Sequence, residues 1–404
     1  MKKRLFVLLF VLTVTAVRAN VVKSITTDGS QPVSALLGDD WDKVDSVIVD
    51  GLLSLDDVTV LANCVKNGCL TGIDMSHCTL PSDSLPSEAF LCTKNLHYIT
   101  LPKSLRAIGS SAFTYSGLIG SCTIPEGVSI IHGGTFEYCS SLTEVVLPKS
   151  LKRIEGAAFR FTSIRAFDLP EGLEYIGPCA FEATPLESIV IPEQVSEIGW
   201  GAFRCQNLKR IHLSEGLREL KTETFAGSSL EQLNWPAYLE VIGEGAFAGS
   251  HLSQVVLPTN VREIGDKAFW ACSHLIWAIL PKSLENINES SFDNTPLQHL
   301  YCQNMVPPMV TKRKDNQQGS TRSVFHTATL YVPIGSSEAY RSAYFWKDFE
   351  RIVEFNVDVV SLAEVRSSPS MSTPTSELFN YNGIRTVGRM PGLYIRNGRK
   401  VVVK

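Results

Sequence analysis

The stretch LPKSLRAIGSSAF at residues 101–113 returns almost unchanged as LPKSLKRIEGAAF at residues 147–159. When the chain is compared with itself, these two stretches prove to be members of a longer series with a fixed step. A repeat of about 20 to 50 residues is typical of proteins built from stacked structural units. The sequence therefore predicts a repeat architecture rather than one or two ordinary globular domains.

The series has a frame, and its zero is the proline of the LP pair. The zero recurs at steps of 22 or 23 residues, with serine standing once for proline: Pro102, Pro125, Pro148, Pro170, Pro192, Ser214, Pro236, Pro258 and Pro281. Phenylalanine stands eleven residues after every zero: Phe113, Phe136, Phe159, Phe181, Phe203, Phe225, Phe247, Phe269 and Phe292. The residue before each of these is always Ala, Thr or Ser. Composition alone cannot produce such regularity.

Each unit also holds about six large apolar residues at fixed slots, which predicts that they point toward a common axis. A unit of this length cannot bury enough apolar surface by itself to offset the conformational entropy that it loses on folding. Stacked units hide each other's apolar faces and pair their backbones. We therefore expect the array, and not the single coil, to be the folding unit.

Two extended segments are predicted in each coil. The motif LxxIxLP alternates as a short strand does, so each coil should add one strand to a parallel sheet along one side. A second piece, LxxIG, as at residues 105–109, should run along the other side. Its glycines suit a tight bend with positive φ: Gly109, Gly177, Gly199, Gly243 and Gly265. The predicted fold class is a repeat solenoid with short parallel β-strands in each coil.

The pattern LxxIxLPxxLxxIGxxAFxxC resembles the BspA-like class of leucine-rich repeats, which occurs in surface proteins of anaerobic gut and oral bacteria. The resemblance covers residues 70–303 by repeat. It implies a leucine-rich repeat fold and adhesion to ligands of the host or of neighbouring cells, with no shared active site. It also implies a C-terminal closure, because family members often end with segments similar to LYVP and WKDF, found here at 330–333 and 346–349.

Residues 1–19 are predicted to be a secretory signal peptide. Lys2, Lys3 and Arg4 precede an apolar run, which ends at the small-residue cleavage pattern Val17-Arg18-Ala19. The run is shorter than the roughly 20 residues that a membrane span needs. No later segment is apolar enough to span a bilayer, so we expect no transmembrane segment in the mature chain.

Residues 20–69 are predicted to be an N-terminal cap that covers the open end of the stack, with α/β character. Ser54 and Asp57 have the spacing of a helix capping box, and Gly68 ends the predicted helix. The solenoid is then expected to span 70–303 and to begin with a degenerate coil. Terminal caps are required because an open stack exposes its apolar ends.

Three segments are predicted after the solenoid. Residues 304–355 should form an α/β C-terminal cap, with strands at TATLYVP and RIVEF and a helix at SSEAYRSAYF between them. Residues 356–376 have the Ser- and Pro-rich composition of a linker. Residues 377–404 are predicted to form a β-hairpin tail around Asn397-Gly398. The tail resembles the sorting segments of type IX secreted proteins, which implies contact with secretion machinery. A hairpin packed on its own chain is the alternative.

The charge balance argues against nucleic acid as a partner. Without the predicted signal peptide, 33 basic residues face 41 acidic ones, a formal charge of −8. The last 27 residues contain six basic residues and no acid, so the body from 20 to 377 carries −14. Such a body repels phosphate.

The cysteines of the repeats are predicted to be buried free thiols. Cys139, Cys205 and Cys272 follow a repeat phenylalanine by two or three residues and lie three coils apart, which is too far for disulfide bonds between them. Four further cysteines crowd the N-terminal cap and leave open whether one bridge forms there: Cys64, Cys69, Cys78 and Cys92.

No converging catalytic or metal-binding set is found. His97, His212 and His299 share the strand side but are about four or five coils apart. His251 and His274 share one slot in adjacent coils, so their side chains should lie about 5 Å apart. With no third ligand in that row, a polar pair is favoured over a zinc site. GxSxG, HExxH and CxxC motifs are absent. We expect no enzyme activity, no cofactor and no metal.

Ligand-binding residues are predicted on the strand side, because this side of a solenoid usually forms its extended concave binding surface. Outward slots lie two and four residues before each zero. The middle coils offer a polar patch of Asp168, Arg210, His212, Gln232 and Asn234. The last coils offer an apolar patch of Ile276, Trp277, Ile279 and Tyr301, and Tyr98 is an outward aromatic residue near the other end. The alternatives are solvated surface for the polar patch and contact with the C-terminal cap for the apolar patch.

The predicted function is that of an exported binding protein of the adhesin type. It would recognise a host or neighbouring-cell protein or glycan through its concave face, at the cell surface or outside the cell. Without a sorting signal in the tail the predicted location is the periplasm. A structural scaffold or assembly subunit of the cell envelope is the alternative function.

Overall fold

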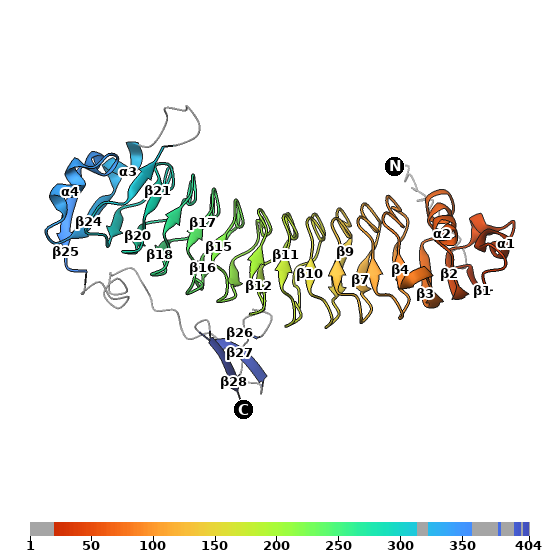
Figure 1. The fold of residues 1–404 in the computed structure, drawn as a ribbon. Helices are drawn as coiled ribbons and strands as arrows, with labels where there is room; N and C mark the ends of the chain where they lie inside the picture. The colour runs from red at the N-terminus through yellow and green to blue at the C-terminus, as the bar shows by residue number, and fades with distance from the viewer. Residues whose placement is uncertain (1–19, 313–321, 358–378, 381–391, 397–398, 404) are drawn as a thin grey trace, which may run out of the picture.

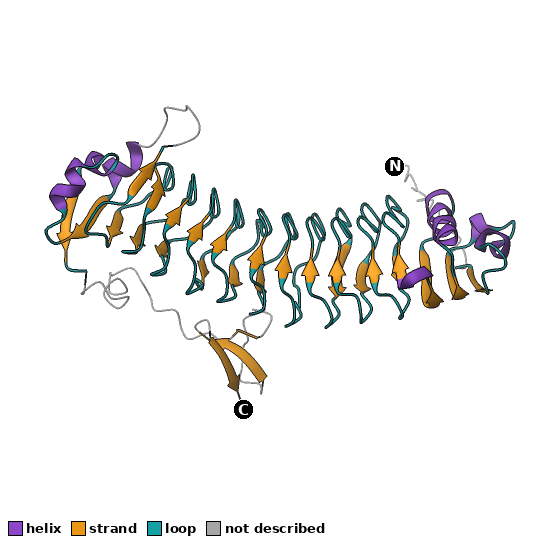
Figure 2. Ribbon diagram, viewed as in Figure 1, coloured by secondary structure: helices purple, strands orange, loops and turns teal. Residues whose placement is uncertain are grey.

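The computed structural model describes residues 20–312, 322–357, 379–380, 392–396 and 399–403. The predicted signal peptide, most of the predicted linker and the hairpin turn at 397–398 lie outside these residues. The solenoid is an elongated, gently curved rod of coils stacked side by side (Figure 1). Helices cluster at the two ends of the rod, while short strands and loops alternate along it (Figure 2).

One side of the rod carries the strands of the LxxIxLP motif, and the caps add strands to this ladder at both ends. Wherever neighbouring strands of this ladder pair, they pair in parallel. We call it the first ladder: β1 Val22–Thr27, β2 Ser46–Leu52, β3 Gly72–Thr79, β5 Tyr98–Thr100, β7 Gly120–Thr123, β9 Leu142–Val146, β12 Ser188–Val190, β14 Arg210–His212, β16 Gln232–Leu233, β18 Gln254–Val256, β20 Trp277–Leu280, β22 His299–Cys302, β24 Thr329–Pro333 and β25 Arg351–Phe355.

The opposite side carries the strands of the LxxIG motif, also in parallel. We call it the second ladder: β4 Ser84–Leu85, β6 Ala107–Ile108, β8 Ile130–Ile131, β10 Arg153–Ile154, β11 Tyr175–Ile176, β13 Glu197–Ile198, β15 Glu219–Leu220, β17 Val241–Ile242, β19 Glu263–Ile264, β21 Asn286–Asn288 and β23 Met309–Thr311. The two predicted extended segments per coil and the predicted fold class are therefore confirmed.

The helices belong to the caps, apart from one short 3-10 turn between β3 and β4. They are α1 Val33–Leu37, η1 Trp41–Lys43, α2 Leu55–Asn67, η2 Pro81–Asp83, α3 Arg322–Thr327, α4 Ser337–Ser342 and η3 Trp346–Asp348. The tail contains β26 Phe379–Asn380, β27 Gly392–Arg396 and β28 Arg399–Val403, and β27 pairs with β28 in antiparallel fashion, as the hairpin signal predicts.

The repeat phenylalanines form the axis of the core. All nine are buried, and Phe90 of the first, irregular coil joins them as a tenth. Neighbouring rings are stacked, with centroids 5.2 to 5.9 Å apart. Stacking of this kind adds to the hydrophobic stabilisation of each coil only when a neighbouring coil is present.

The predicted role of the LxxIG glycines is wrong. None of the five has positive φ. A Cβ at Gly199 would lie 2.3 Å from the backbone nitrogen of Pro178, and one at Gly109 would lie 2.3 Å from that of Ser87. These glycines are needed because neighbouring coils approach each other closely at this point. Positive φ occurs instead two residues before and two residues after many of the phenylalanines, as at Ala157 and Phe161.

Within the described residues the first ladder is interrupted at three places: between β5 and β7, between β9 and β12, and between β16 and β18. An aromatic residue marks each of the last two. Residues 164–169 form no strand, and Phe167 is buried there, 4.8 Å from both the Phe159 and Phe181 rings. Between β16 and β18, Trp235 packs edge-on against Phe247 at 5.3 Å. Phe167 and Trp235 occupy two different slots of the frame, and in each slot the neighbouring coils hold a smaller, aliphatic side chain. The backbone there must shift, so the ladder hydrogen bonds are lost.

Candidate binding surface

The pleat of the first ladder decides which side chains face outward. In β20 and β22, Ala278 and Leu300 are fully buried in the core, whereas Trp277 and Tyr301 beside them are only half-buried. Because successive residues of a strand point to opposite faces, the slots two and four residues before each zero lie on the outer face. The slots are not equally accessible, because Val190 and Ile279, both two residues before a zero, are buried.

The polar patch is only partly assembled by the fold. Arg210 and Gln232 are register partners on β14 and β16, and both are exposed. His212 is half-buried beside Val190, and its Nε2 lies 3.9 Å from a Glu193 carboxylate oxygen. Arg210, Gln232 and His212 therefore form one continuous group.

The other two predicted members of the polar patch stand apart from this group. Asp168 is exposed but lies in the coil that has no strand, and the Val190 slot separates it from His212. The Asn234 amide bonds the backbone of the neighbouring coil twice. Its Oδ1 accepts from the Leu213 N–H at 2.7 Å, and its Nδ2 donates to the Leu213 carbonyl at 3.0 Å. It thus replaces a backbone pair where β16 has ended.

Tyr98 is exposed at the N-terminal end of the first ladder. Its ring lies across Gly72 of β3, where any Cβ would collide with the ring at 2.1 Å. It stands apart from the other predicted site residues, because β7 and β9 lie between it and the coil of Asp168, and the remaining site residues are farther along the rod.

At the C-terminal end the cap extends the outer face instead of lying over it. Strand β24 pairs with β22 so that Tyr331 is the register partner of Tyr301. The two rings stack at 4.3 Å, and Phe355 of β25 meets Tyr301 edge-on at 5.5 Å. Burial, followed by the neighbouring Tyr331, raises the pKa of Tyr301. Of the apolar patch, Ile279 is buried, while Ile276, Trp277 and Tyr301 stay half-buried.

The sequence analysis missed Tyr331 and Thr329 as members of this face. The sequence does contain a signal for these two residues. If Pro333 is taken as a further zero, Thr329 and Tyr331 stand four and two residues before it, in the outward slots of the repeat. The long insertion after β23 hides this extra frame from a search for steps of 22 or 23 residues.

The thiols of the repeat coils lie in the core. The ten cysteines, all within the described residues, form no disulfide bonds, and this includes the four of the N-terminal region. Burial raises the pKa of Cys139 and of Cys272 to about 11 and that of Cys205 to about 12. Each of these three donates to the carbonyl of the phenylalanine one coil earlier, for example Cys139 to Phe113 at 3.1 Å. These three cysteines are buried free thiols, as predicted, and they also act as small hydrogen-bond donors.

The His251 and His274 rings are adjacent as predicted, with centroids 4.9 Å apart. Within the described residues, no group of three or more His, Cys, Asp or Glu side chains has a geometry that could hold a metal. In the same part of the chain, no helix is long and apolar enough to cross a bilayer.

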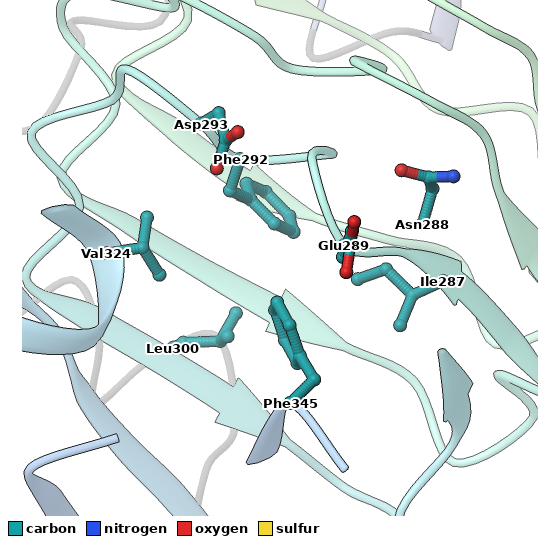
Figure 3. Close-up of a pocket in the computed structure, with 8 residues that line it drawn as sticks. All are labelled: Ile287, Asn288, Glu289, Phe292, Asp293, Leu300, Val324 and Phe345. Atoms are coloured by element: carbon teal, nitrogen blue, oxygen red, sulfur yellow. The ribbon is translucent and has the colours of Figure 1, made fainter. Parts of the chain in front are cut away.

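A cavity of about 10 Å³ lies where the last coil meets the C-terminal cap, which is room for about one water molecule. Ile287, Phe292 and Leu300 line it from the coil side, and Val324 and Phe345 line it from the cap (Figure 3). It is a packing defect at a junction and offers no space for a substrate.

The repeat frame agrees with the repeats of a known protein family. The chain matches the family described as "BspA type Leucine rich repeat region (6 copies)" over residues 63–184, 134–251 and 200–309, which together cover more than half of its length. No curated protein matches it.

Among solved structures, it is similar to a leucine-rich repeat protein from Bacteroides ovatus, with 21% identity, a TM-score of 0.45 and coverage of 73% of this chain and 92% of that one. It is also similar to the pneumococcal vaccine antigen PcpA, with 18% identity, a TM-score of 0.43 and coverage of 78% and 80%. A third is a leucine-rich cell surface protein from Faecalibacterium prausnitzii, with 21% identity, a TM-score of 0.29 and coverage of 68% and 84%. The repeat frame, the stacked phenylalanines and the family match lead to one conclusion: the chain belongs to the BspA-type leucine-rich repeat family.

Proposed function

We propose that this protein is an exported, non-enzymatic binding protein of the adhesin type. The observation that carries the proposal is the first ladder, which presents two rows of outward side chains along the rod on a rigid core of stacked phenylalanines. Rigid, extended surfaces of this kind suit large partners, because little side-chain or backbone entropy is lost when they bind.

The proposed partner is a protein or a glycan of the host or of a neighbouring cell. Two regions of the outer face are the proposed contact sites. The first is the group of Arg210, His212 and Gln232, and the second is the surface around Trp277 and Tyr301. Nucleic acid is excluded from the proposal because the body carries a formal charge of −14. The proposed location is the cell surface or the extracellular space.

A binding screen tests the proposal. The purified chain is applied to arrays of glycans and of extracellular-matrix proteins, together with the Arg210→Ala, Trp277→Ala and Trp200→Ala variants. Trp200 is a matched control, because it is an exposed tryptophan that lies outside the first ladder. We expect a ligand whose binding falls with Arg210→Ala or Trp277→Ala and not with Trp200→Ala. If neither Arg210→Ala nor Trp277→Ala changes the affinity for a ligand, the binding site lies outside the two proposed contact sites.

Deletion of residues 377–404 separates the proposal from the alternative of an envelope scaffold. Because the proposed binding surface lies entirely within the first ladder, the shortened protein should bind its ligand in solution with unchanged affinity. Loss of ligand binding together with the tail would contradict the proposal.

A further inference from the structure

Four consecutive strands near the C-terminal end of the first ladder lie in segments without charged residues. The four segments 251–258, 274–281, 296–303 and 328–333, which contain β18, β20, β22 and β24, have no Asp, Glu, Lys or Arg. In the whole chain 19% of residues are of these types, and strand segments on both sides of these four contain them, such as Arg210 in β14 and Arg351 in β25, the register partner of Thr329. Near the other end of the ladder, the segments 96–102 and 119–125 are also uncharged. Four consecutive uncharged segments within a body of −14 mark a distinct surface.

The outward side chains of β18, β20, β22 and β24 form this surface, which we call the neutral strip. One row is polar and aromatic, and register pairing brings its members side by side: Gln254, Trp277, His299 and Thr329. The second row ends in Tyr301 and Tyr331. All six of these side chains are half-buried, so each keeps part of its surface accessible.

The neutral strip is held rigid by contacts among its own members. The Tyr301 and Tyr331 rings stack with an angle of 10° between their planes. The Tyr331 hydroxyl lies 3.2 Å from Nδ1 of His299, so it bridges the two rows. Side chains that are already ordered lose little entropy when a ligand binds.

We propose that the neutral strip binds an uncharged oligosaccharide chain, an inference that rests on the proposed function and names its ligand class. A surface without formal charges gives no advantage to an acidic or basic polymer. Trp277 offers apolar aromatic area, and the Gln254 amide and the His299 imidazole lie on either side of it in the same row. Planar polar groups beside an aromatic ring match the hydroxyls and the apolar faces of sugar rings.

The spacing between the strands of the neutral strip also matches the spacing between residues of a sugar polymer. Parallel strands are spaced about 4.8 Å apart, which is close to the advance of one residue along an extended, β-linked sugar chain. Successive sugars would therefore meet successive strands of the strip, with the chain running parallel to the rod.

A peptide that binds as an added strand is not favoured here. Strands β20, β22 and β24 are each paired on both sides, so the backbone groups of these three strands are already satisfied within the ladder. Of the strands of the neutral strip, β18 alone has an unpaired edge, which faces the interruption after β16 and not the row around Trp277. β-Strand addition requires a free edge. Along the paired strands, a peptide would have to bind through side chains alone, without the main-chain hydrogen bonds that give strand addition its affinity.

The full chain is tested on an array of neutral and acidic oligosaccharides and matrix proteins, and affinities for the best neutral ligand are then measured by calorimetry at low and high salt. Trp277→Ala should weaken binding at least tenfold, the loss expected of a central aromatic contact. Tyr331→Phe removes one hydroxyl but keeps the ring stack, and it should weaken binding by a smaller factor. Trp200→Ala should change nothing, and raising the salt concentration should leave the affinity unchanged.

Three outcomes would overturn the inference. They are selective binding of acidic glycans, a neutral-glycan affinity that both Trp277→Ala and Tyr331→Phe leave unaltered, and capture of a matrix protein through Trp277 with no neutral glycan bound. The last outcome would leave the proposed function intact, because a macromolecular ligand would still occupy the first ladder. Absence of any ligand on either array would contradict both.

Discussion

At the scale of single residues, glycine is required in some slots of the repeat by the neighbouring coil and not by its own backbone. Gly199 and Gly216 show the difference. Neither has positive φ, but a Cβ at Gly199 would lie 2.3 Å from the Pro178 backbone, whereas a Cβ at Gly216 would meet nothing within 4 Å. The second position is glycine without a steric reason in the structure.

Alanine substitution at these two positions should therefore have opposite effects. Gly199→Ala forces two coil backbones apart and should lower the free energy of unfolding by about 1–3 kcal/mol. Gly216→Ala should be neutral or stabilise by up to about 1 kcal/mol, because it reduces the entropy of the unfolded chain. Urea unfolding followed by circular dichroism measures both. Equal effects of the two substitutions would refute the close-approach explanation.

Thiol reactivity gives a second prediction at this scale. Cys92 is exposed, while burial holds the pKa of thiols such as Cys139 and Cys205 at about 11 and about 12. The thiolate is the reactive form, so buried thiols of this kind should stay unmodified at neutral pH. A maleimide reagent added to the native protein should label Cys92 first, and Cys92→Ser should abolish this rapid phase. Rapid labelling of Cys139 or Cys205, detected by peptide mass spectrometry, would mean that the stack is open.

At the scale of elements, helix α2 depends on its N-terminal cap. Asp57 and Ser54 form the predicted capping box, and an Asp57 carboxylate oxygen also accepts a hydrogen bond from the Val33 N–H at the start of α1. Burial by itself would raise the pKa of Asp57, but the hydrogen bonds from Val33 and Ser54 outweigh it and hold the pKa below its ordinary value. One carboxylate therefore joins two helices of the N-terminal cap.

Asp57→Ala should lower the stability of this cap by about 1–2 kcal/mol near neutral pH. A carboxyl with a depressed pKa in the folded state contributes its full stability above its unfolded pKa of about 3.9, and loses it as the pH falls through the lower folded value. The difference between the two proteins should therefore shrink below about pH 4. Urea unfolding between pH 6 and pH 3 measures it. A difference that grows on acidification would contradict the assignment.

The strands of the two ladders were predictable because their signal is local and occurs many times. The LxxIxLP and LxxIG motifs fix both ladders, and the hairpin signal gives the pairing of β27 with β28. The interruptions were not predictable in the same way. Phe167 and Trp235 are apolar residues in apolar slots, and only contact with Phe159, Phe181 and Phe247 of the core shows that they are too large for regular pairing.

At the scale of the whole molecule, the coil is the structural unit, and its core contacts are with the coil before it and the coil after it. Each phenylalanine contacts the rings before and after it, for example Phe203 at 5.3 Å from Phe181 and 5.9 Å from Phe225. The stability of such arrays is approximately a sum of coil terms and of nearest-neighbour terms. Removal of one complete frame leaves every remaining neighbour contact of the same kind.

Deletion of residues 193–214, one frame of the repeat, should therefore give a folded protein with a lower unfolding midpoint and one remaining cooperative transition. Phe225 would then stack on Phe181. Deletion of residues 193–203 removes half a frame and puts every later apolar slot out of step, so this control should not fold. Circular dichroism and thermal unfolding compare the two. Similar behaviour of both deletions would contradict the repeat frame.

The sequence by itself determined the period, the buried phenylalanine stack, the two parallel ladders and the capping box of α2, because each depends on apolar spacing or local hydrogen bonding within one coil or helix. The tertiary structure alone decided the role of Gly199, the engagement of the Asn234 amide by Leu213, and the addition of Tyr331 to the face that carries Tyr301. These depend on what the adjacent coil or cap brings within contact. Such contacts depend on how the coils stack, and the spacing of residues within a single coil does not predict them.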